Sequence, residues 1–276
     1  MHELSVREHF DIAGPCLESI VGHTWHHGDP ALEAKGHSVL EACRALEDHL
    51  ISASGLRAGG RALDFGSGVG GPTVHMAAFS GASFVGLSNN EWLSQRARKL
   101  AAAVDLQHRV SFFTTGDDDY RTLLAFGDAS FDALTFFEST CYLDDKQAFF
   151  RAAHRVLKPG ARLVGTERLQ RSFAEHLTEA QIMTFMQPLN DCCCIPGHGT
   201  LASYRAMLEA AGFKVLVARD LFEGVQCWGS QPPEDREDWD AYEGPQAEHI
   251  RAGKAALDAA RDAGVFTVGM FVAQKI

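Results

Sequence analysis

The sequence predicts an α/β fold in which a doubly wound sheet carries helices on both faces. Short apolar runs alternate with helical patterns through the middle of the chain, and a glycine-rich turn follows the first of these runs. Alternation of this kind implies parallel strands covered by helices on both sides. The chain has 276 residues and is 46% hydrophobic, which is enough to fill one large core.

The predicted elements follow one another in order from residue 61 onward. Strands are expected at residues 61–66, 83–88, 110–116, 131–138, 161–169 and 265–274, and helices at residues 72–79, 90–104, 146–157 and 248–264. Residues 209–221 have the pattern of a helix end, a glycine and a further strand, followed by a polar loop. The final strand is expected to close the sheet.

Two segments fall outside this alternation and are expected to cover a binding site. Residues 1–50 begin with an amphipathic stretch, and residues 170–200 form a long apolar insertion after the fifth core strand. Open α/β sheets bind ligands at the carboxyl ends of their strands, where both segments are able to lie. We therefore expect a single domain with a core at residues 60–169, these two covers, and residues 201–276 completing the sheet.

Charge and composition exclude several classes of function. A formal net charge of −11 argues against a broad surface for nucleic acid or an anionic membrane. No apolar run has the length of a membrane-spanning helix, and the first residues lack the pattern of a signal peptide, so a cytoplasmic protein is expected. The seven cysteines lack paired C-x-x-C spacing, which favours reduced thiols over a zinc site. Small molecules or proteins are the expected partners, and a homo-oligomer is neither indicated nor excluded.

The glycine-rich turn at residues 63–71 points first to a nucleotide cofactor. Gly66, Gly68 and Gly71 fit the pattern G-x-G-x-x-G, which links a strand to a helix in dinucleotide-binding folds. That interpretation requires an acid about 20 residues further on, at the end of the second strand. Asn89 and Asn90 stand there instead, which disfavours a nicotinamide cofactor.

An acid beside the glycine turn favours a cationic ligand. Asp64 can accept hydrogen bonds from an ammonium group while the open glycine backbone lets a nucleoside approach; the alternative is an aspartate that only caps the turn. The D-x-G-x-G-x-G pattern, TTGDDD and RVLKPGARL together resemble the class I S-adenosylmethionine-dependent methyltransferases. The resemblance implies their Rossmann-like fold and S-adenosylmethionine as cofactor. The residues expected to bind it are Asp64, Gly66, Gly68, Gly70, Asn89, Asn90, Asp117, Asp118 and Phe137.

Glu138 is a charged residue at the end of a run that otherwise has the pattern of a buried strand. A carboxylate is costly to bury unless it is paired. At the carboxyl end of the fourth strand, its side chain is expected to project into the cleft that faces the cofactor. Glu138 is therefore a candidate catalytic residue; the alternative is a structural carboxylate that pairs with an arginine or caps the next helix.

The stretch FESTCYLDDKQAFFRAAHRVLKPGARLV resembles the prenyl diphosphate C-methyltransferases, of which geranyl diphosphate C-methyltransferase is the best-known type, and the sterol C-methyltransferases. GLSNN, SYRAMLEAAGF and DAGVFTVGMFVAQK fit the same families. In the geranyl diphosphate enzymes, a glutamate in an N-E-S-T segment is held to stabilise a carbocation and take its proton, which implies that role for Glu138. Whether Mg²⁺ is needed stays open, because substrate phosphates often hold most of this ion.

Carbon methylation of an alkene is consistent with these residues. The alkene attacks the sulfonium methyl with its π electrons, so no base is required at the start, and a fixed carboxylate then stabilises the positive charge and removes the neighbouring proton. Aromatic faces add about 1 to 2 kcal/mol each to cation stabilisation. His198 is a candidate second base or diphosphate contact, with an isolated structural histidine as the favoured alternative.

The covering segments supply the candidate substrate contacts. HTWHHGDP resembles the histidine-rich N-terminal segment of the geranyl diphosphate enzymes, although their H-H-H-Y order is W-H-H-G here. Its histidines are candidates to hold a diphosphate or its metal; the alternative is a polar loop with surface histidines. Cys192, Cys193 and Cys194 stand where those enzymes carry an aromatic residue, and we expect them to line or pack the pocket. The expected substrate-binding residues are Trp25, His26, His27, Tyr142, Phe185 and Trp228.

The leading hypothesis is methyl transfer from S-adenosylmethionine to carbon of an isoprenoid of secondary metabolism, and three rivals stay open. The first is an O- or N-methyltransferase of a natural-product scaffold, in which Glu138 or His198 deprotonates a hydroxyl or amine. The second is a cofactor-binding protein without catalysis. The third is a nicotinamide-dependent dehydrogenase, which the asparagine at position 89 disfavours.

Overall fold

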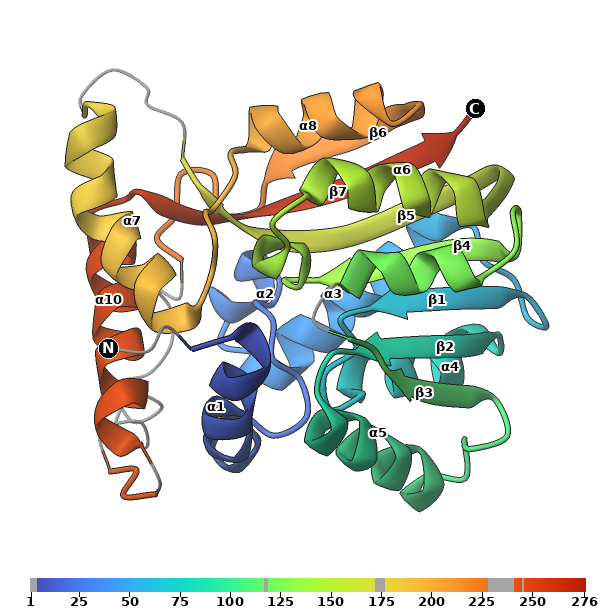
Figure 1. The fold of residues 1–276 in the computed structure, drawn as a ribbon, viewed down its shortest axis with the longest axis horizontal. Helices are drawn as coiled ribbons and strands as arrows, with labels where there is room; N and C mark the ends of the chain where they lie inside the picture. The colour runs from blue at the N-terminus through green and yellow to red at the C-terminus, as the bar shows by residue number, and fades with distance from the viewer. Residues whose placement is uncertain (1–3, 117–118, 172–176, 228–240, 245) are drawn as a thin grey trace.

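A seven-stranded sheet forms the centre of the molecule. The computed structural model describes residues 4–116, 119–171, 177–227, 241–244 and 246–276. The strands lie in the spatial order β3-β2-β1-β4-β5-β7-β6 (Figure 1). They are β1 (Arg61–Phe65), β2 (Ser83–Ser88), β3 (Val110–Thr114), β4 (Phe131–Phe137), β5 (Leu157–Gln170), β6 (Phe213–Asp220) and β7 (Phe266–Lys275).

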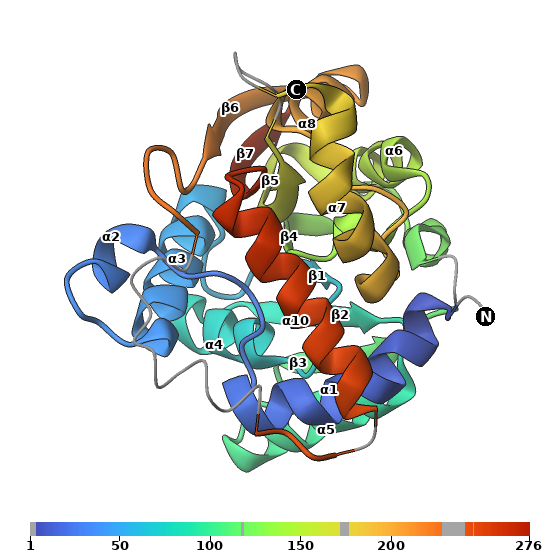
Figure 2. The same cartoon turned by 90° about the vertical axis from the view of Figure 1, so that its left-hand side faces the viewer.

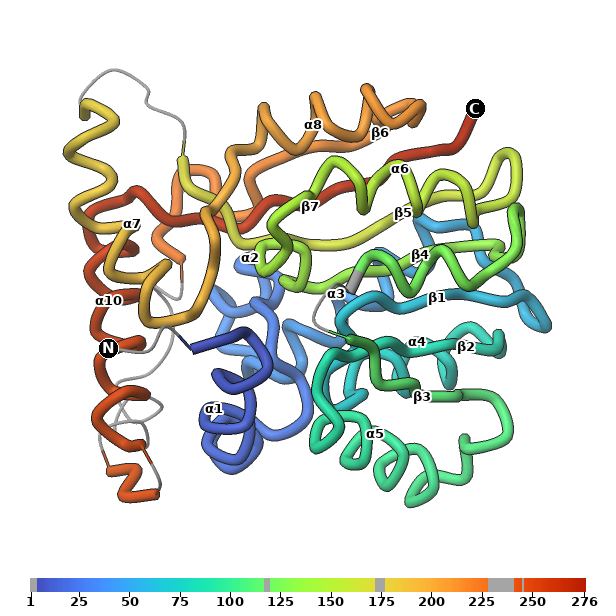
Figure 3. The backbone as a smooth tube through the Cα atoms, in the orientation of Figure 1, coloured from blue at the N-terminus to red at the C-terminus, as the bar shows by residue number. Residues whose placement is uncertain are grey.

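The sheet is parallel from β1 to β5, as the alternation predicts, but its last strand departs from the prediction. β7 lies between β5 and β6 and is antiparallel to both, so it is an interior strand and β6 forms the edge (Figure 3). The first residue of β7, Phe266, pairs with Gln170 at the carboxyl end of β5. Because β7 starts at that end of the sheet, it has to run back in the opposite direction.

Helices cover both faces of the sheet. One face carries α3 (Val39–Ser54), α4 (Gly71–Ser80) and α5 (Glu91–Ala103), and the other carries the short η1 (Asp119–Ala125), α6 (Lys146–Val156) and α8 (Leu201–Ala210). Successive side chains of a strand point to opposite faces, so β1 places Ala62 in the first layer and Leu63 and Phe65 in the second. The core therefore consists of two apolar layers, one on each side of the sheet.

Three helices lie across the carboxyl ends of the parallel strands, as Figure 2 shows from that side. They are α1 (Val6–Val21), α7 (Glu179–Cys193) and α10 (Ala247–Asp262), and α7 packs along α10. α1 begins at a capping box of Ser5 and Glu8, which satisfies two backbone groups at its first turn. The end of the sheet where open α/β folds bind ligands is thus enclosed.

The segments that cover the carboxyl ends of the strands differ in part from the two that were predicted. The expected boundary of the N-terminal cover at residue 50 falls inside α3, and α3 packs on the sheet and against α4. The short α2 (Pro30–Glu33) contacts α3. α10, which was predicted only as a helix that precedes the last strand, joins the cover. The cover therefore comes from three parts of the chain.

Other features concern cysteines, metals and membranes. All seven cysteines are free thiols. In the part of the chain that the structure describes, no group of three or more histidine, cysteine or acidic side chains is placed to hold a metal ion. Among the same residues, no helix combines the length and the apolar composition needed to span a bilayer.

Candidate active site

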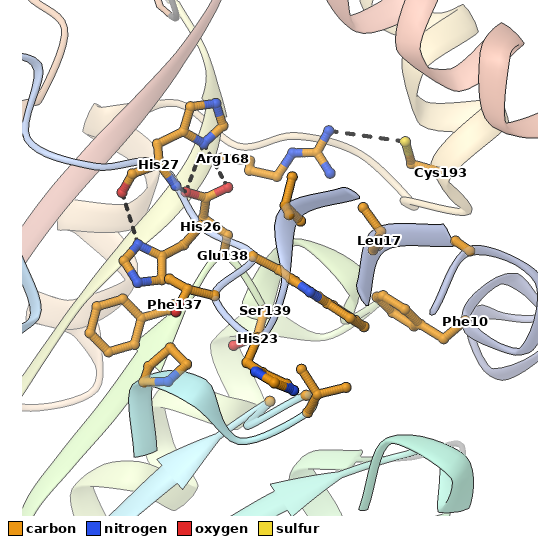
Figure 4. Close-up of a pocket in the computed structure, with 18 of the residues that line it drawn as sticks. Phe10, Leu17, His23, His26, His27, Phe137, Glu138, Ser139, Arg168 and Cys193 are labelled. Carbon is orange, nitrogen blue, oxygen red and sulfur yellow. Dashed lines mark hydrogen bonds and ion pairs between the residues drawn. The ribbon is translucent and has the colours of Figure 1, made fainter. Parts of the chain in front are cut away.

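A cavity of about 760 Å³ opens at the carboxyl ends of β1, β2, β4 and β5. Its walls also include α1, the loop at residues 23–27, the glycine turn, the end of α7 and α10 (Figure 4). A mainly apolar cavity with a few placed polar groups is the usual form of a small-molecule site. The predicted site residues that line it are Trp25, His26, His27, Asp64, Gly66, Gly68, Asn89, Phe137, Glu138 and Tyr142.

The glycine turn forms one wall of the cavity. Gly66 has a φ of +76°, and a Cβ at this position would lie 2.1 Å from the Cβ of Ser139, so only glycine fits. Gly68 has a φ of +53°, but a Cβ there would meet only the ring of Trp25, at 4.0 Å. The backbone of Gly68 therefore faces open space and allows a ligand to approach closely.

Asp64 lies beside the turn, where two hydroxyl groups hold its carboxylate. Thr73 Oγ1 donates to one oxygen at 2.5 Å and Thr135 Oγ1 to the other at 2.7 Å. Burial raises the pKa of Asp64 to about 6, although both hydrogen bonds act to lower it. A cationic ligand would favour the ionised carboxylate, which is the form that an ammonium group binds.

Polar atoms without partners surround this part of the cavity. Ser67 Oγ and Thr24 Oγ1 are buried and have no hydrogen-bond partner among the described residues. Asn89 lines the cavity at the end of β2. These groups, together with the accessible backbone of Gly68 and the carboxyl of Asp64, match a ligand that carries ribose hydroxyls and an ammonium group. The residues present therefore fit S-adenosylmethionine.

Glu138 follows the last residue of β4 and is 8% exposed. Its φ of +50° lies in the left-handed region, which is uncommon for a residue with a side chain and is often found at functional sites. Its backbone N–H donates to the carbonyl oxygen of Thr166 at 2.8 Å. This conformation turns the carboxylate toward the cavity and toward the loop at residues 23–27 (Figure 4).

His27 holds the carboxylate of Glu138. Its ring Nδ1 lies 2.8 and 2.9 Å from the two carboxylate oxygens, and its backbone N–H donates to one of them at 2.7 Å. Burial alone would raise the pKa of Glu138, but the charge and hydrogen bonds of His27 outweigh it and keep that pKa below its usual range. Burial also opposes the charge on His27, yet Cys227 and Glu138 raise its pKa to about 10. The result is a buried imidazolium–carboxylate pair.

His26 is held differently and is not available to a diphosphate. Its Nε2 lies 3.0 Å from Glu47 and its Nδ1 lies 2.8 Å from the carbonyl oxygen of His27. The ring packs on Phe137 with a centroid distance of 4.6 Å. Both histidines are buried, so the alternative of a polar loop with surface histidines is wrong.

Arg168, near the carboxyl end of β5, lines the cavity and was missed by the sequence analysis. Its neighbour Glu167 faces away and accepts hydrogen bonds from the backbone N–H groups of Thr140 and Cys141 at 2.7 and 3.1 Å. Arg168 could have been found by the argument that identified Glu138, because both are charged residues near the end of a predicted buried strand.

Two of the predicted cofactor-binding residues lie outside the cavity and have structural roles. Asn90 caps α5 by accepting from the N–H of Leu93 at 3.1 Å, and its Nδ2 donates to Asp11 on α1 at 2.7 Å. Gly70 begins α4 with its Cα directed at Ala97, where an added Cβ would approach within 2.8 Å. The geometry gives both residues structural roles: Asn90 fixes two helices, and Gly70 permits tight packing.

His198 and Phe185 are also outside the cavity lining. His198 is buried with its Nδ1 2.6 Å from the side-chain oxygen of Asn190, and burial holds its pKa well below the usual range, so the geometry supports the structural alternative. Phe185 packs against the apolar layer beneath α7 because its helix directs it there. The predicted residues Asp117, Asp118 and Trp228 lie outside the described residues. Of the three adjacent cysteines, Cys192 and Cys193 line the cavity.

Comparisons with known proteins agree with this geometry. A family model described as a methyltransferase domain matches residues 38–218. The chain is 33% identical over 154 residues to sterol 24-C-methyltransferase of Aspergillus fumigatus, a match that covers 56% of this chain and 39% of that protein. It is 34% identical over 154 residues to 27-O-demethylrifamycin SV methyltransferase of Amycolatopsis mediterranei, covering 56% and 54%. The chain thus spans about half the length of these curated relatives.

Solved structures resemble the fold over nearly the whole chain. The [4+2]-cyclase SpnF has a TM-score of 0.79 at 23% identity, with 99% of this chain and 97% of that chain covered. Geranyl diphosphate C-methyltransferase from Streptomyces coelicolor A3(2), in complex with Mg²⁺, geranyl diphosphate and S-adenosyl-L-homocysteine, has a TM-score of 0.71 at 18% identity, with 97% of each chain covered. These likenesses concern the fold alone, and the reaction has to be argued from the site.

Proposed function

Because the chain belongs to the class I S-adenosylmethionine-dependent methyltransferase family, we propose that it transfers the cofactor's methyl group to a carbon atom of an isoprenoid or similar alkene. The observation that carries this proposal is the carboxylate of Glu138, held by His27 at the edge of a mainly apolar cavity. Ser139, the next residue, packs on Gly66 of the glycine turn. Glu138 therefore lies beside the wall where the cofactor is expected.

The cofactor, when bound, supplies an electrophilic methyl group, and the protein has to manage the positive charge that appears on the acceptor carbon. Glu138 is held as a carboxylate by His27, so it can stabilise that charge without first losing a proton. The same oxygen can then take the neighbouring proton of the acceptor. The rings of Phe10, Trp25 and Tyr142 line the cavity, and each aromatic face adds about 1 to 2 kcal/mol of cation stabilisation.

A prenyl diphosphate is the acceptor that we favour within this class. The sterol 24-C-methyltransferase among the relatives and the geranyl diphosphate C-methyltransferase among the similar folds both act, by name, on carbon of isoprenoid compounds. The cavity size of about 760 Å³ lies within the range for ligand sites and leaves room beside a nucleoside cofactor. Mg²⁺ would be held mainly by the diphosphate, as is common for this ion.

The test is product analysis with purified protein, S-adenosylmethionine, and a panel of prenyl diphosphates and sterols, with and without Mg²⁺. Mass spectrometry and NMR locate the new methyl group. We expect a C-methylated product from the wild type and a fall in kcat of about 100- to 1000-fold for Glu138→Gln, which keeps the shape but removes the charge. Glu248→Gln, at an exposed acid of α10, is the matched control and should retain full activity.

Affinity for S-adenosylhomocysteine separates a catalytic effect from misfolding. We expect Glu138→Gln to bind it within about twofold of the wild-type affinity, since its side chain keeps one oxygen for His27. A Glu138→Gln enzyme that methylates carbon at the wild-type rate would exclude the role of the carboxylate. A methyl group found only on oxygen or nitrogen would exclude carbon transfer.

Heteroatom methylation is a second candidate because the His27–Glu138 pair also has the arrangement of a general base and its orienting acid. The relative from Amycolatopsis mediterranei is named as a methyltransferase of a 27-O-demethyl compound. The pH profile distinguishes the two reactions. A base at His27 would have to lose its proton first, so heteroatom transfer should rise as pH approaches about 10, whereas alkene transfer should stay flat from neutral pH upward.

A further inference from the structure

We propose that Arg168 binds an anionic group of the methyl acceptor, a carboxylate or a phosphate, through its guanidinium at the wall of the cavity beside β5. Among the described residues, no carboxylate oxygen lies within ion-pair distance of this guanidinium, and its Nε is buried without a hydrogen-bond partner. The nearest polar contact is the thiol of Cys193, 4.0 Å from Nη2 (Figure 4). A thiol is a weak acceptor and does not neutralise a guanidinium.

A guanidinium at a cavity wall without an ion-pair partner requires a physical explanation. Arg168 is partly buried, and taking a charged group even partly out of water costs free energy unless a partner of opposite charge compensates it. The two acids closest in sequence and space already have partners: Glu138 pairs with His27, and Glu167 binds the backbone of Thr140 and Cys141. A ligand that brings its own negative charge into the cavity would supply the missing compensation.

The other permanent cations along the cavity are neutralised. Lys254 lies 2.5 Å from Asp258, and Arg261 pairs with Asp258 and Asp262 at 3.5 and 3.1 Å. Both are on α10, whereas Arg168 is on β5. Arg168 is therefore the permanent cation of the cavity lining that forms no ion pair among the described residues.

The positive charge of Arg168 helps to lower the pKa of two histidines, His9 and His198. Burial, and then the charges of His249 and Arg168, lower the pKa of His9 to about 4, so His9 stays neutral at physiological pH. Burial followed by Arg168 and Lys146 also keeps the pKa of His198 well below its usual range. His9 lines the cavity together with Arg168, so the wall carries a positive charge at this part.

The guanidinium geometry defines the class of ligand. Arginine presents paired N–H donors in a fixed fork that matches two oxygens of a carboxylate or a phosphate. Its stem and charge are supported by Phe266, whose ring centroid lies 5.6 Å from the guanidinium carbon. An acceptor with an apolar body and an anionic head would place the head at Arg168 and the body along the apolar wall near Glu138. This placement rests on the proposed function, since it concerns the acceptor of the same reaction.

The experiment measures binding rather than turnover, so it can succeed or fail independently of carbon methylation. Isothermal titration calorimetry is performed on the protein saturated with S-adenosylhomocysteine, without metal. The probes are inorganic phosphate, inorganic diphosphate, geranyl diphosphate, geranic acid and the neutral alcohol geraniol. We expect the anionic probes to bind and Arg168→Gln to weaken their binding by at least about tenfold. Arg168→Lys, which keeps the charge but loses the fork, should fall between the two.

Matched controls identify the cause of any loss. Lys254→Gln removes a cavity-lining cation that is already neutralised and should bind every probe within about twofold of the wild type. Geraniol affinity and S-adenosylhomocysteine affinity should be the same in the wild type and in Arg168→Gln, which shows that the variant is folded. Stronger binding of geranic acid than of the phosphates would assign the head group as a carboxylate, and the reverse order would assign a phosphate.

Three results would overturn the proposal. The first is wild-type protein that binds none of the anions, and the second is Arg168→Gln protein that binds them as tightly as the wild type. The third is a loss of S-adenosylhomocysteine affinity in Arg168→Gln as large as the loss for the anions, which would assign the guanidinium to the carboxylate of the cofactor. Anion binding through Arg168 without any C-methylated product would refute the proposed function and leave this site in place.

Discussion

A carboxylate that is 8% exposed stays ionised only when a cation or several donors compensate it, and at Glu138 the compensation comes from His27. Three hydrogen bonds from one histidine, two from the ring and one from the backbone, fix the carboxylate in position. The pair carries no net charge, so its field on an acceptor depends on which partner is nearer. Both residues line the cavity, and the proposed function requires that the carboxylate of Glu138 is the partner nearer to the acceptor carbon.

The protonation of His27 predicts how stability depends on pH. Its folded-state pKa of about 10 is above the usual value of 6.5, so its contribution to stability is complete below about pH 6.5 and is lost as pH rises toward about 10. We expect the wild type to lose about 1 to 3 kcal/mol more of its free energy of unfolding across that window than His27→Gln does. Urea titrations of both proteins at four pH values measure the difference.

His49→Gln is the control for this comparison, because His49 is an exposed histidine on the sheet-covering helix α3. Its curve should follow that of the wild type. Parallel curves for the wild type and His27→Gln would mean that His27 is neutral in the folded protein at pH 7. In that case Glu138 would be held by neutral hydrogen bonds, and the general-base alternative would gain support.

Residue-level inference from sequence named residues that line the cavity. Glu138 was found because it is a charged residue at the end of an apolar run, and Asp64 because it is an acid beside the glycine turn; both line the cavity. Arg168 satisfied the criterion that identified Glu138 and was overlooked. The partner of Glu138 could not be predicted, because His27 is 111 residues away and no spacing rule links a loop to the end of a strand. The capping role of Asn90 was not anticipated, because a helix cap and a ligand contact use the same residue type at the same place.

At the scale of elements, β5 supports the site with both faces of its carboxyl end. Arg168 faces the cavity, while Glu167 is directed to the other side and binds η2 (Thr140–Tyr142), the short turn that follows Glu138. Thr140 donates to Glu167 through both its N–H and its hydroxyl, at 2.7 and 2.5 Å. One strand therefore fixes the turn that carries the candidate catalytic carboxylate.

Removing that support should destabilise the protein and displace Glu138. Glu167→Ala leaves the N–H groups of Thr140 and Cys141 buried without an acceptor, so we expect a loss of about 2 to 4 kcal/mol in the free energy of unfolding. Glu167→Gln retains one carbonyl oxygen and should lose about half as much. Urea denaturation followed by circular dichroism measures both variants. A Glu167→Ala protein as stable as the wild type would show that the turn is held by other contacts.

Elements were predicted better than their arrangement. Every predicted strand and helix of the core is present, because a period of two or of 3.6 residues is a local property. The direction of β7 is not local: it follows from the position of α10 at the carboxyl ends of the strands, which no pattern within residues 265–274 records. Likewise, α3 has the amphipathic pattern of a cover, and only the packing shows that the surface it covers is the sheet.

At the scale of the whole molecule, the net charge of the chain is opposite in sign to the charge that Arg168 places at the cavity wall. The chain carries a formal net charge of −11, so an anionic acceptor approaches against an overall repulsion. Within the cavity, Arg168 contributes a positive charge that no acid of the described chain is paired with, while Asp64 marks the part of the wall expected to hold the cationic cofactor. Long-range repulsion and short-range attraction therefore act on the same ligand, and they differ in their response to salt.

This difference predicts an unusual effect of ionic strength. Raising NaCl from about 10 to about 100 mM shortens the screening length from about 30 to about 10 Å, which weakens the repulsion from distant surface charges more than the short-range attraction to a partly buried guanidinium. We expect the association rate of geranyl diphosphate to rise about two- to tenfold, measured by stopped-flow fluorescence, while that of geraniol is unchanged. Arg168→Gln should keep the salt dependence of association, because the repulsion is a property of the whole surface, but should dissociate faster. An association rate that falls with salt in the wild type would mean that local attraction extends to the cavity mouth and dominates the approach of the ligand.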